Sequence, residues 1–385
     1  MAPAASQTTL PDEVTEDILL RLDSAADVAR AAGASTAHRR VVRGHRFQRR
    51  FRSLRPPPVI GFLSSLSAAE FHHAEAPHRS APLARAAARE GDFSFSFLPR
   101  EIHGWFVHDA RDGRVLLSRR ERGDGAFLDL VVCDPLRRRY VLIPRIPEEV
   151  VLKRYSAEME SEPFLAAASE EEGEELKFKV IYNWMSKFKI DTFVFTSDTG
   201  KWCAATSVSL VPNRAISNPK VFVRHYVRGC FYWVHYGSKH MLVLDQGKMK
   251  FSIVATPFLH ADKRIRGLAA FDAGVNGLGL IVLGRDDTML ELYYKNNGGG
   301  VEEEWRRHKC IPLPEPGYVY SIIRAAEGYL LLLGKKHGEG EGSQYFTIDL
   351  KTFMAEVVLD AIRHHSCSLI CQLPVASVGA KHMKW

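Results

Sequence analysis

The stretch VVCDPLRRRYVL (residues 131–142) contains in one place the unit from which most of this chain is built. An apolar segment runs into a turn that carries an aspartate, and a second segment rich in β-branched and aromatic residues leaves that turn. An Asp-Pro pair between two such segments is typical of a tight turn, because the carboxylate can bond to its own backbone. The stretch therefore predicts an antiparallel hairpin.

Similar strand–turn–strand units recur along the chain. Successive turn residues are spaced by 64, 47, 51 and 53 positions, at Asp134, Asp198, Asp245, Asn296 and Asp349. A period near 50 residues with about four strands per unit is what a kelch-type β-propeller requires. Dividing the 328 residues from Pro58 to Trp385 by this period predicts about six blades. A β-sandwich is the alternative architecture, but it does not need the recurrence.

Other segments are assigned by the same patterns. Asp109 lies only 25 residues before Asp134, which predicts two hairpins of one blade, with Asp109 in the first turn. Residues 93–97 (FSFSF) read as a strand, and the Ala/Arg-rich residues 81–90 as a helical turn or a loop. The acidic run at residues 170–175 is expected to form a mobile loop.

The N-terminal part follows a helical period instead. In LPDEVTEDILLRL (residues 10–22), Leu10, Val14, Ile18 and Leu22 recur every fourth residue and share one face. Pro11 suits a first helical turn, and two acidic residues follow it at the positive end of the helix dipole.

Two further short helices are predicted after the first. Ser24 with Asp27 reads as a capping box, Gly33 is expected to interrupt the helix, and residues 36–42 form the third, which ends near Gly44. About 40 residues of helix bury too little to be robust alone, so the apolar stripe is expected to meet a partner. With prolines at 56–58 as a linker, the fold class is α+β multidomain: helices at 8–55 and an all-β propeller at 59–385.

Several motifs in this order resemble a known family. Leu-Pro-x-Glu at residues 10–13, Ile-Leu-x-Arg-Leu at 18–22, Val-x-Arg at 28–30, Arg-Arg-x-Val at 39–42 and Phe-x-x-x-Phe at 47–51 are similar to an F-box. Residues 131–144 resemble the propeller-type, kelch-like associated domain of plant F-box proteins. The sequence departs from the family at Ser35, Thr36 and His38, where many members have Cys, a basic residue and Trp.

The resemblance implies a function and a set of contact residues. It implies a non-catalytic adaptor of a Skp–cullin–F-box ubiquitin ligase, which docks on the Skp-type adaptor and, through it, on a cullin–RING ligase, while the propeller binds an unknown target. The residues that would meet the Skp-type adaptor are Leu10, Pro11, Val14, Ile18, Leu19, Leu22 and Val28. The alternative is a stand-alone propeller that binds proteins or glycans. A propeller hydrolase is a third class, and it would require acids or histidines that converge on the central channel.

Composition limits the partners and the compartment. The formal net charge of +7 comes largely from arginines between residues 39 and 55, which we interpret as a solvated helix face, so nucleic-acid binding is not expected. No apolar run is long enough to span a bilayer and residues 1–9 do not read as a leader, so we expect no membrane association. Six scattered cysteines fit reduced thiols and a cytoplasmic or nuclear location.

Candidate metal and catalytic residues are few. His72, His73 and His78 lie in a loop without a paired second cluster. A denser group consists of His364, His365, Cys367 and Cys371. The sequence alternates at residues 366–371, which is typical of a strand with buried thiols. No Gly-x-Ser-x-Gly or phosphate-loop signature occurs, so neither metal, cofactor nor catalysis is expected.

Overall fold

The structure is a computed structural model, and it describes residues 10–22, 25–54, 57–64, 70–99, 105–119, 129–147, 160–167, 177–186, 188–210, 222–235, 238–257, 265–284, 288–295, 305–326, 328–336, 342–361 and 368–372. The chain contacts divide into two compact units. One comprises Met1–Pro58 with Gln372–Trp385, and the other is Val59–Cys371.

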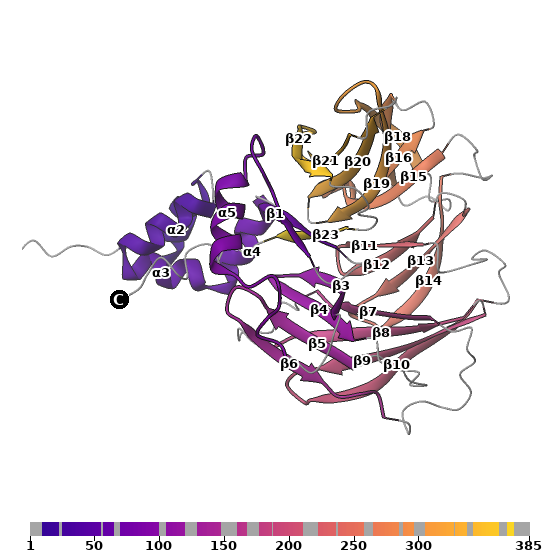
Figure 1. Cartoon of the computed structure of the whole chain (residues 1–385), viewed down its shortest axis with the longest axis horizontal. Helices are drawn as coiled ribbons and strands as arrows, with labels where there is room; N and C mark the ends of the chain where they lie inside the picture. The colour runs from indigo at the N-terminus through magenta and orange to yellow at the C-terminus, as the bar shows by residue number, and fades with distance from the viewer. Residues whose placement is uncertain are drawn as a thin grey trace, which may run out of the picture. The chain divides into compact units, whose positions relative to one another are not determined.

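The first unit is helical and contains four described helices, not the three that were predicted. They are α1 (Asp12–Leu20), α2 (Ala25–Ala34), α3 (Thr36–Arg43) and α4 (His45–Leu54) (Figure 1). Gly33 lies inside α2 rather than interrupting it, and Ser35 caps α3 by accepting a hydrogen bond from the His38 N–H at 3.4 Å. Ser24 of the expected capping box lies outside the described residues.

The fourth helix was missed because its apolar residues are sparse among arginines. Phe47 and Phe51, four residues apart, lie on one face of α4, and their ring centroids are 5.7 Å apart. Both are only 1% exposed and pack in the core of the helical unit. Such burial stabilises a helix whose other positions are strongly polar.

The second unit contains a propeller of five four-stranded blades. In each blade the strands follow chain order, and neighbouring strands are antiparallel. The blades are coloured from purple to gold in Figure 1. Blade 1 is β3 (Trp105–Arg111), β4 (Arg114–Arg119), β5 (Asp129–Asp134) and β6 (Arg139–Ile143). Blade 2 is β7 (Glu160–Leu165), β8 (Lys179–Met185), β9 (Lys189–Thr196) and β10 (Lys201–Ser209).

The remaining blades repeat this meander. Blade 3 is β11 (Val223–Val227), β12 (Cys230–Val234), β13 (His240–Asp245) and β14 (Lys250–Ala255). Blade 4 is β15 (Ile265–Asp272), β16 (Leu278–Gly284), β17 (Met289–Lys295) and β18 (Trp305–Pro312), with the short helix η3 (Gly274–Asn276) between the first two strands. Blade 5 is β19 (Tyr318–Ala326), β20 (Tyr329–Lys336), β21 (Ser343–Asp349) and β22 (Ala355–Ala361).

The expected count of six blades is corrected to five. The other three strands form a separate three-stranded sheet in the order β2-β1-β23, from β1 (Val59–Ser64), β2 (Phe71–His73) and β23 (Ser368–Gln372). Division of the length by 50 assigned every residue to a blade, although α5 (Ala81–Glu90) and the turns after it also take up chain. Since β23 pairs with β1, backbone hydrogen bonds join the two ends of the unit.

The recurring turn residues mark the blades correctly. Asp134, Asp198, Asp245 and Asp349 each lie at the turn between the third and fourth strands of a blade, and Asn296 lies outside the described residues. The carboxylates of three of them accept backbone N–H bonds from residues two or three positions on, at 2.9–3.1 Å. Their interpretation as turn-formers is therefore confirmed.

Two segments near the start of the second unit have a secondary structure that the sequence did not predict. Residues 81–90, predicted as a helical turn or loop, form α5. The FSFSF run, predicted as a strand, forms turns instead: the Asp92 carboxylate accepts bonds from the hydroxyls of Ser94 and Ser96, and Phe95 has a φ of 57°. These local side-chain bonds offer the backbone an alternative to strand pairing.

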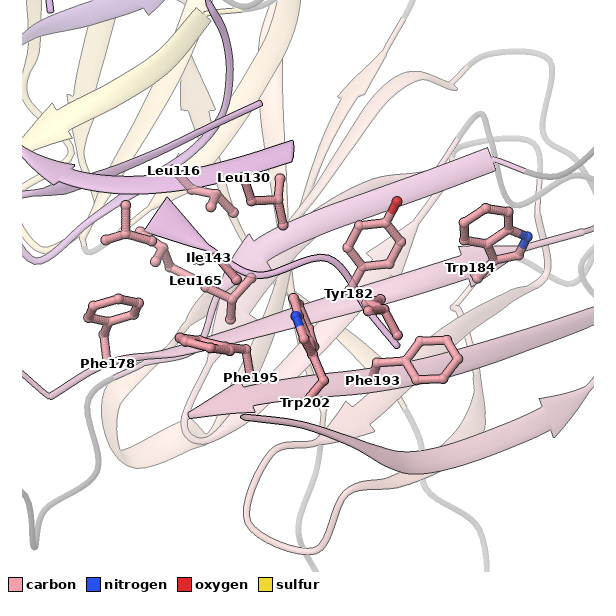
Figure 2. Close-up of a cluster of buried hydrophobic side chains, with 13 residues drawn as sticks. Leu116, Leu130, Ile143, Leu165, Phe178, Tyr182, Trp184, Phe193, Phe195 and Trp202 are labelled. Carbon is pink, nitrogen blue, oxygen red and sulfur yellow. The ribbon is translucent and has the colours of Figure 1, made fainter. Parts of the chain in front are cut away.

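Apolar clusters lie between neighbouring blades. One joins blades 1 and 2 and includes Leu116, Leu130, Phe178, Tyr182 and Trp202 among its buried side chains (Figure 2). The indole N–H of Trp202 donates to the carbonyl oxygen of Pro144 at 2.6 Å, so its one polar atom is satisfied in the core. Burial of this kind fixes how each blade packs on the next.

Candidate functional site

A row of exposed apolar side chains follows one face of α1. Val14 and Ile18 are 44% and 50% exposed, and Leu10, just before the helix, is 59% exposed. Pro11 is also exposed. We call Leu10, Val14 and Ile18 the α1 row. Large apolar side chains spaced by four residues on one helix face are the usual anchors of a helix in a partner's groove.

Three of the seven predicted contact residues do not belong to this surface. Leu19 and Val28, at 2% and 0% exposure, lie in the core of the helical unit, and the half-buried Leu22 packs against that core. They lie inside because α1 must bury one face to pack on α3 and α4. The predicted set therefore splits into an outer surface, which is Pro11 with the α1 row, and an inner support.

Several of the arginines between residues 39 and 55, which account for most of the net charge, form ion pairs with acidic residues of α1. Glu16, only 6% exposed, pairs with Arg50 at 2.7 Å and with Arg46 at 3.4 Å. Asp12 pairs with Arg40 at 2.6 Å. These pairs join side chains of α3 and α4 to α1, and each exposed pair contributes about 0–1 kcal/mol.

A second charged group lies among the innermost strands of the propeller. Asp109 on β3 is 1% exposed and accepts the Leu165 N–H at 3.0 Å and an N–H of Arg324 at 3.4 Å. Arg224 on β11 lies 3.4 Å from the other side of this carboxylate. We call Asp109, Arg224, Arg324 and Glu162 the central ion network.

Glu162 on β7 completes this network. It accepts a hydrogen bond from Arg224 and a second from the indole N–H of Trp233 at 2.8 Å. The guanidinium of Arg224 also lies over the ring of Phe164, 4.0 Å from the centroid. The network thus links the first strands of blades 1, 2, 3 and 5.

Irregular pairing directs these side chains to the centre. The β3–β4 register shifts between Val107 and Asp109, and the β19–β20 register shifts between Ile322 and Arg324. One extra residue in a strand re-aims the side chains beside it. In a regular strand, alternation alone would decide which way Asp109 and Arg324 point.

The surroundings set the charge states of the network. Burial alone would raise the pKa of Asp109, but Arg224 and Arg324 outweigh it and leave that pKa below its usual value. Burial lowers the pKa of Arg324 to about 10, which still leaves it charged near neutral pH. Burial and the nearby Arg324 lower the pKa of His225 to about 3, and burial with Arg224 lowers that of His108 to about 4.

These states favour a structural role for the network. Acids and histidines do converge on the centre, which is the arrangement that a propeller hydrolase would need. Asp109 meets Arg224 and Arg324 and accepts the Leu165 N–H, and Glu162 accepts from Arg224 and from the indole N–H of Trp233. Each carboxylate therefore serves as an ion-pair partner that joins strands of different blades.

The sequence placed Asp109 wrongly, in a hairpin turn. The turn of the β3–β4 hairpin is formed by Asp112 and Gly113, with φ angles of 51° and 75°. An Asp-Gly pair is the stronger signal for a two-residue hairpin turn and would have corrected the position. Arg224 and Arg324 carried no local signal, since their role depends on partners far away in the chain.

Of the histidines and cysteines weighed as metal ligands, the structure describes only some. His78 is buried, bonds to the hydroxyl of Thr347 at 3.1 Å and accepts the Ser80 N–H at the same distance, and burial lowers its pKa. No group of three metal-binding side chains occurs within the described ranges. His364, His365 and Cys367 lie outside those ranges, and Cys371 is on β23.

Comparison with known proteins leaves the family open. No protein-family model matches the chain, and no curated protein sequence matches it. Among solved structures, a putative 6-phosphogluconolactonase from Bacteroides fragilis has a TM-score of 0.34 at 12% identity, over 68% of this chain and 71% of that one. The lectin of Aleuria aurantia, solved with α-methyl-L-fucoside, has a TM-score of 0.35 at 12% identity, over 67% and 77%.

A third structure covers more of the chain. A post-proline cleaving enzyme from Rickettsia typhi has a TM-score of 0.39 at 9% identity, over 92% of this chain and 58% of that one. Values this low say nothing about function, so the propeller assignment rests on the strand order of the five blades. Among the described residues, no helix is both long and apolar enough to cross a membrane.

Proposed function

We propose that this protein is a substrate-recognition adaptor of a Skp–cullin–F-box type ubiquitin ligase. In this proposal the helical unit docks on the Skp-type adaptor through the α1 row, and the propeller binds a target protein. The protein itself performs no transfer chemistry. It brings a target to the ligase.

The observation that carries the proposal is the division of α1 into two faces. Leu19 and Leu20 are buried at 2% and 6% exposure, while Val14 and Ile18 remain about half exposed on the same helix. Leaving large apolar side chains in water is unfavourable, and burial of such a row against a partner recovers that free energy. The motif resemblance, from residues 10–51, names the kind of partner.

The test uses the full chain and a purified Skp-type adaptor. Val14→Asp with Ile18→Asp removes two half-exposed anchors and would bury two charges at the contact. Each lost anchor contributes about 1 kcal/mol, and burying the two new charges adds to this cost, so affinity measured by titration calorimetry should fall at least about 30-fold. Val275→Asp is the matched control, because Val275 is 99% exposed in η3 of the propeller unit.

Three results bear on the proposal. Thermal unfolding of the double variant should match the wild type, because neither side chain belongs to the helical core. Adaptor binding that is equal in the wild type and the double variant refutes a contact through the α1 row. A wild-type chain that does not bind the Skp-type adaptor at all refutes the ligase role and favours a stand-alone binding propeller.

A further inference from the structure

The outer strand of blade 1 exposes apolar side chains that the other outer strands do not. On β6, three consecutive large residues, Tyr140, Val141 and Leu142, are 41%, 43% and 56% exposed. Among the described residues of β10, β14, β18 and β22, no Val, Leu, Ile, Met, Phe, Tyr or Trp side chain is exposed. β18, for example, exposes Arg306 and Arg307 instead, and charges of this kind keep an edge strand from pairing with another chain. The centre of β6 lacks this protection.

The same strand is a free edge of its sheet. In the order β3-β4-β5-β6, β6 pairs with β5 through five register pairs, from Arg139–Asp134 to Ile143–Leu130 (Figure 1). The backbone N–H and C=O groups of β6 that point away from β5 have no strand partner within the described part of the chain. Such an edge can accept an added strand through main-chain hydrogen bonds.

The exposed side chains lie on both faces of this edge. Because successive side chains of a strand alternate, Tyr140 and Leu142 share one face and Val141 lies on the other. A strand added beside β6 would therefore meet an apolar neighbour on each face. The ring of Tyr140 also contacts that of Phe97, with centroids 6.4 Å apart. A ring that is already held loses little conformational freedom when a partner covers it.

Positive charge adjoins the apolar residues at the β5–β6 turn. Arg137, Arg138 and Arg139 are all exposed. Arg137 pairs with Asp134 at 2.7 Å, whereas Arg138 and Arg139 form no ion pair with any described residue. An acidic side chain of a partner strand would complement this charge and help to fix the register of pairing.

A second copy of β6 matches this edge less well. Antiparallel pairing that places Val141 opposite its own copy would also place Arg137 opposite Arg145. Like charges directly opposite each other destabilise an antiparallel pair. Arg145 already pairs with Asp129 at 2.5 Å and Arg137 with Asp134, so neither copy offers a spare carboxylate there. The charge of the edge therefore favours a partner of the opposite sign.

We propose that β6 binds an extended segment of another protein, in which three β-branched or aromatic residues adjoin an acidic residue. The segment would add a strand to the four of blade 1. Its backbone would bond to the free edge, its apolar side chains would cover residues 140–142, and its acidic side chain would meet Arg139. The proposal goes beyond the adaptor function and does not depend on it, since β6 lies in the propeller unit and the α1 row in the helical unit.

Two labelled peptides test the chemistry of the partner. One has three valines flanked on both sides by glutamates, and the other has lysines in place of the glutamates. When the full chain is titrated into each and fluorescence anisotropy is measured, the glutamate peptide should bind at least about tenfold more tightly. Absence of binding by the glutamate peptide, or equal binding of the two peptides, overturns the proposal.

Hydrogen exchange shows where the peptide binds. In the complex, exchange of the backbone amides at residues 139–143 should slow, because the outward N–H groups gain hydrogen bonds from the added strand. Protection confined to another blade would place the peptide elsewhere and overturn the proposal.

A matched pair of variants tests the apolar row. Val141→Gln with Leu142→Gln removes two exposed apolar side chains without adding charge and should weaken binding of the glutamate peptide about tenfold. Val275→Gln with Met354→Gln makes the same kind of change at side chains that are 99% and 62% exposed in blades 4 and 5, and should leave binding unchanged. Thermal melts of both variants should match the wild type, and equal losses of affinity in the two would exclude β6 as the site.

A second pair of variants tests the charge. Arg138→Gln with Arg139→Gln should reduce the preference for the glutamate peptide about fivefold, because the cations that attract it are removed. Lys335→Gln with Lys336→Gln makes the same charge change at two exposed positions of β20 and should leave the preference as it is. An unchanged preference in the arginine variant overturns the acidic partner.

Sedimentation of the full chain tests the competing occupant. The wild type should remain monomeric, since a second copy of β6 sets Arg137 against Arg145. A wild type that dimerises, together with a Val141→Gln, Leu142→Gln variant that does not, would assign this edge to a second copy and overturn the proposal.

Discussion

Asp109→Asn tests whether the central ion network holds the blades together. Asp109 is 1% exposed, and its carboxylate meets Arg224 and Arg324, each at 3.4 Å, and the Leu165 N–H at 3.0 Å. Asparagine keeps the size and one acceptor but removes the charge. Two buried guanidiniums are then left with Glu162 as the single carboxylate of the network.

The expected loss follows from the cost of an uncompensated buried charge. Removing one partner of a buried ion pair costs about 3–5 kcal/mol. For a unit that runs from Val59 to Cys371, with an unfolding entropy of about 2.1 cal/mol/K per residue, this loss lowers Tm by about 5–8 °C. Differential scanning calorimetry of the full chain at pH 7 measures the shift.

Asp134→Asn is the matched control for this measurement. It makes the same chemical change at a turn, where asparagine can accept the same backbone N–H bonds from Leu136 and Arg137. The turn also loses an exposed ion pair with Arg137, worth about 0–1 kcal/mol. If Asp109→Asn melts as the control does, the network adds no stability and its proposed structural role is wrong.

Three further changes test other parts of the molecule. The folded state holds His225 neutral by lowering its pKa from 6.5 to about 3, so its contribution to stability is complete above pH 6.5 and is lost as the pH falls toward 3. When the free energy of unfolding is measured by urea titration, His225→Gln should therefore lose about 2 kcal/mol less of it than the wild type between pH 7 and pH 5. The same dependence of the free energy of unfolding on pH in both proteins would refute this linkage. Gly279→Ala should cost about 1–3 kcal/mol, because the new Cβ would lie 2.4 Å from the Phe271 ring, whereas Gly342→Ala meets nothing within 4 Å and should be neutral in the same thermal melts. Phe47→Ala should cost the helical unit about 3–5 kcal/mol, since Phe47 is 1% exposed, and an unchanged helical circular-dichroism transition would show that α4 does not support the core.

Local patterns were sufficient for much of the fold. The four-residue spacing from Leu10 to Ile18 indicated α1, and the Asx turns at Asp134, Asp245 and Asp349 indicated the blade hairpins. The 25-residue spacing of Asp109 and Asp134 correctly placed both in one blade. Each of these signals depends on neighbours within a few residues, so one sequence is enough to read it.

Where local and tertiary forces compete, the patterns gave the wrong element. FSFSF alternates as a strand does, yet Asp92 bonds to the hydroxyls that follow it and turns the chain. In α4, burial of two phenylalanines stabilises a helix that the sequence analysis missed, because its other positions are mostly arginines. The prediction of six blades was wrong, because chain length divided by the period also counted residues that lie outside the five blades.

The sequence by itself determined the repeat, the hairpin turns and the amphipathic first helix, because these depend on residues close together in the chain. Tertiary structure alone decided which α1 side chains remain exposed and which charged residues meet at the propeller centre. Asp109 and Arg324 are 215 positions apart, and they meet because blades 1 and 5 place their first strands around one axis and a bulge turns each side chain inward. Contacts over such separations follow from the closure of the whole fold, so no local pattern encodes them.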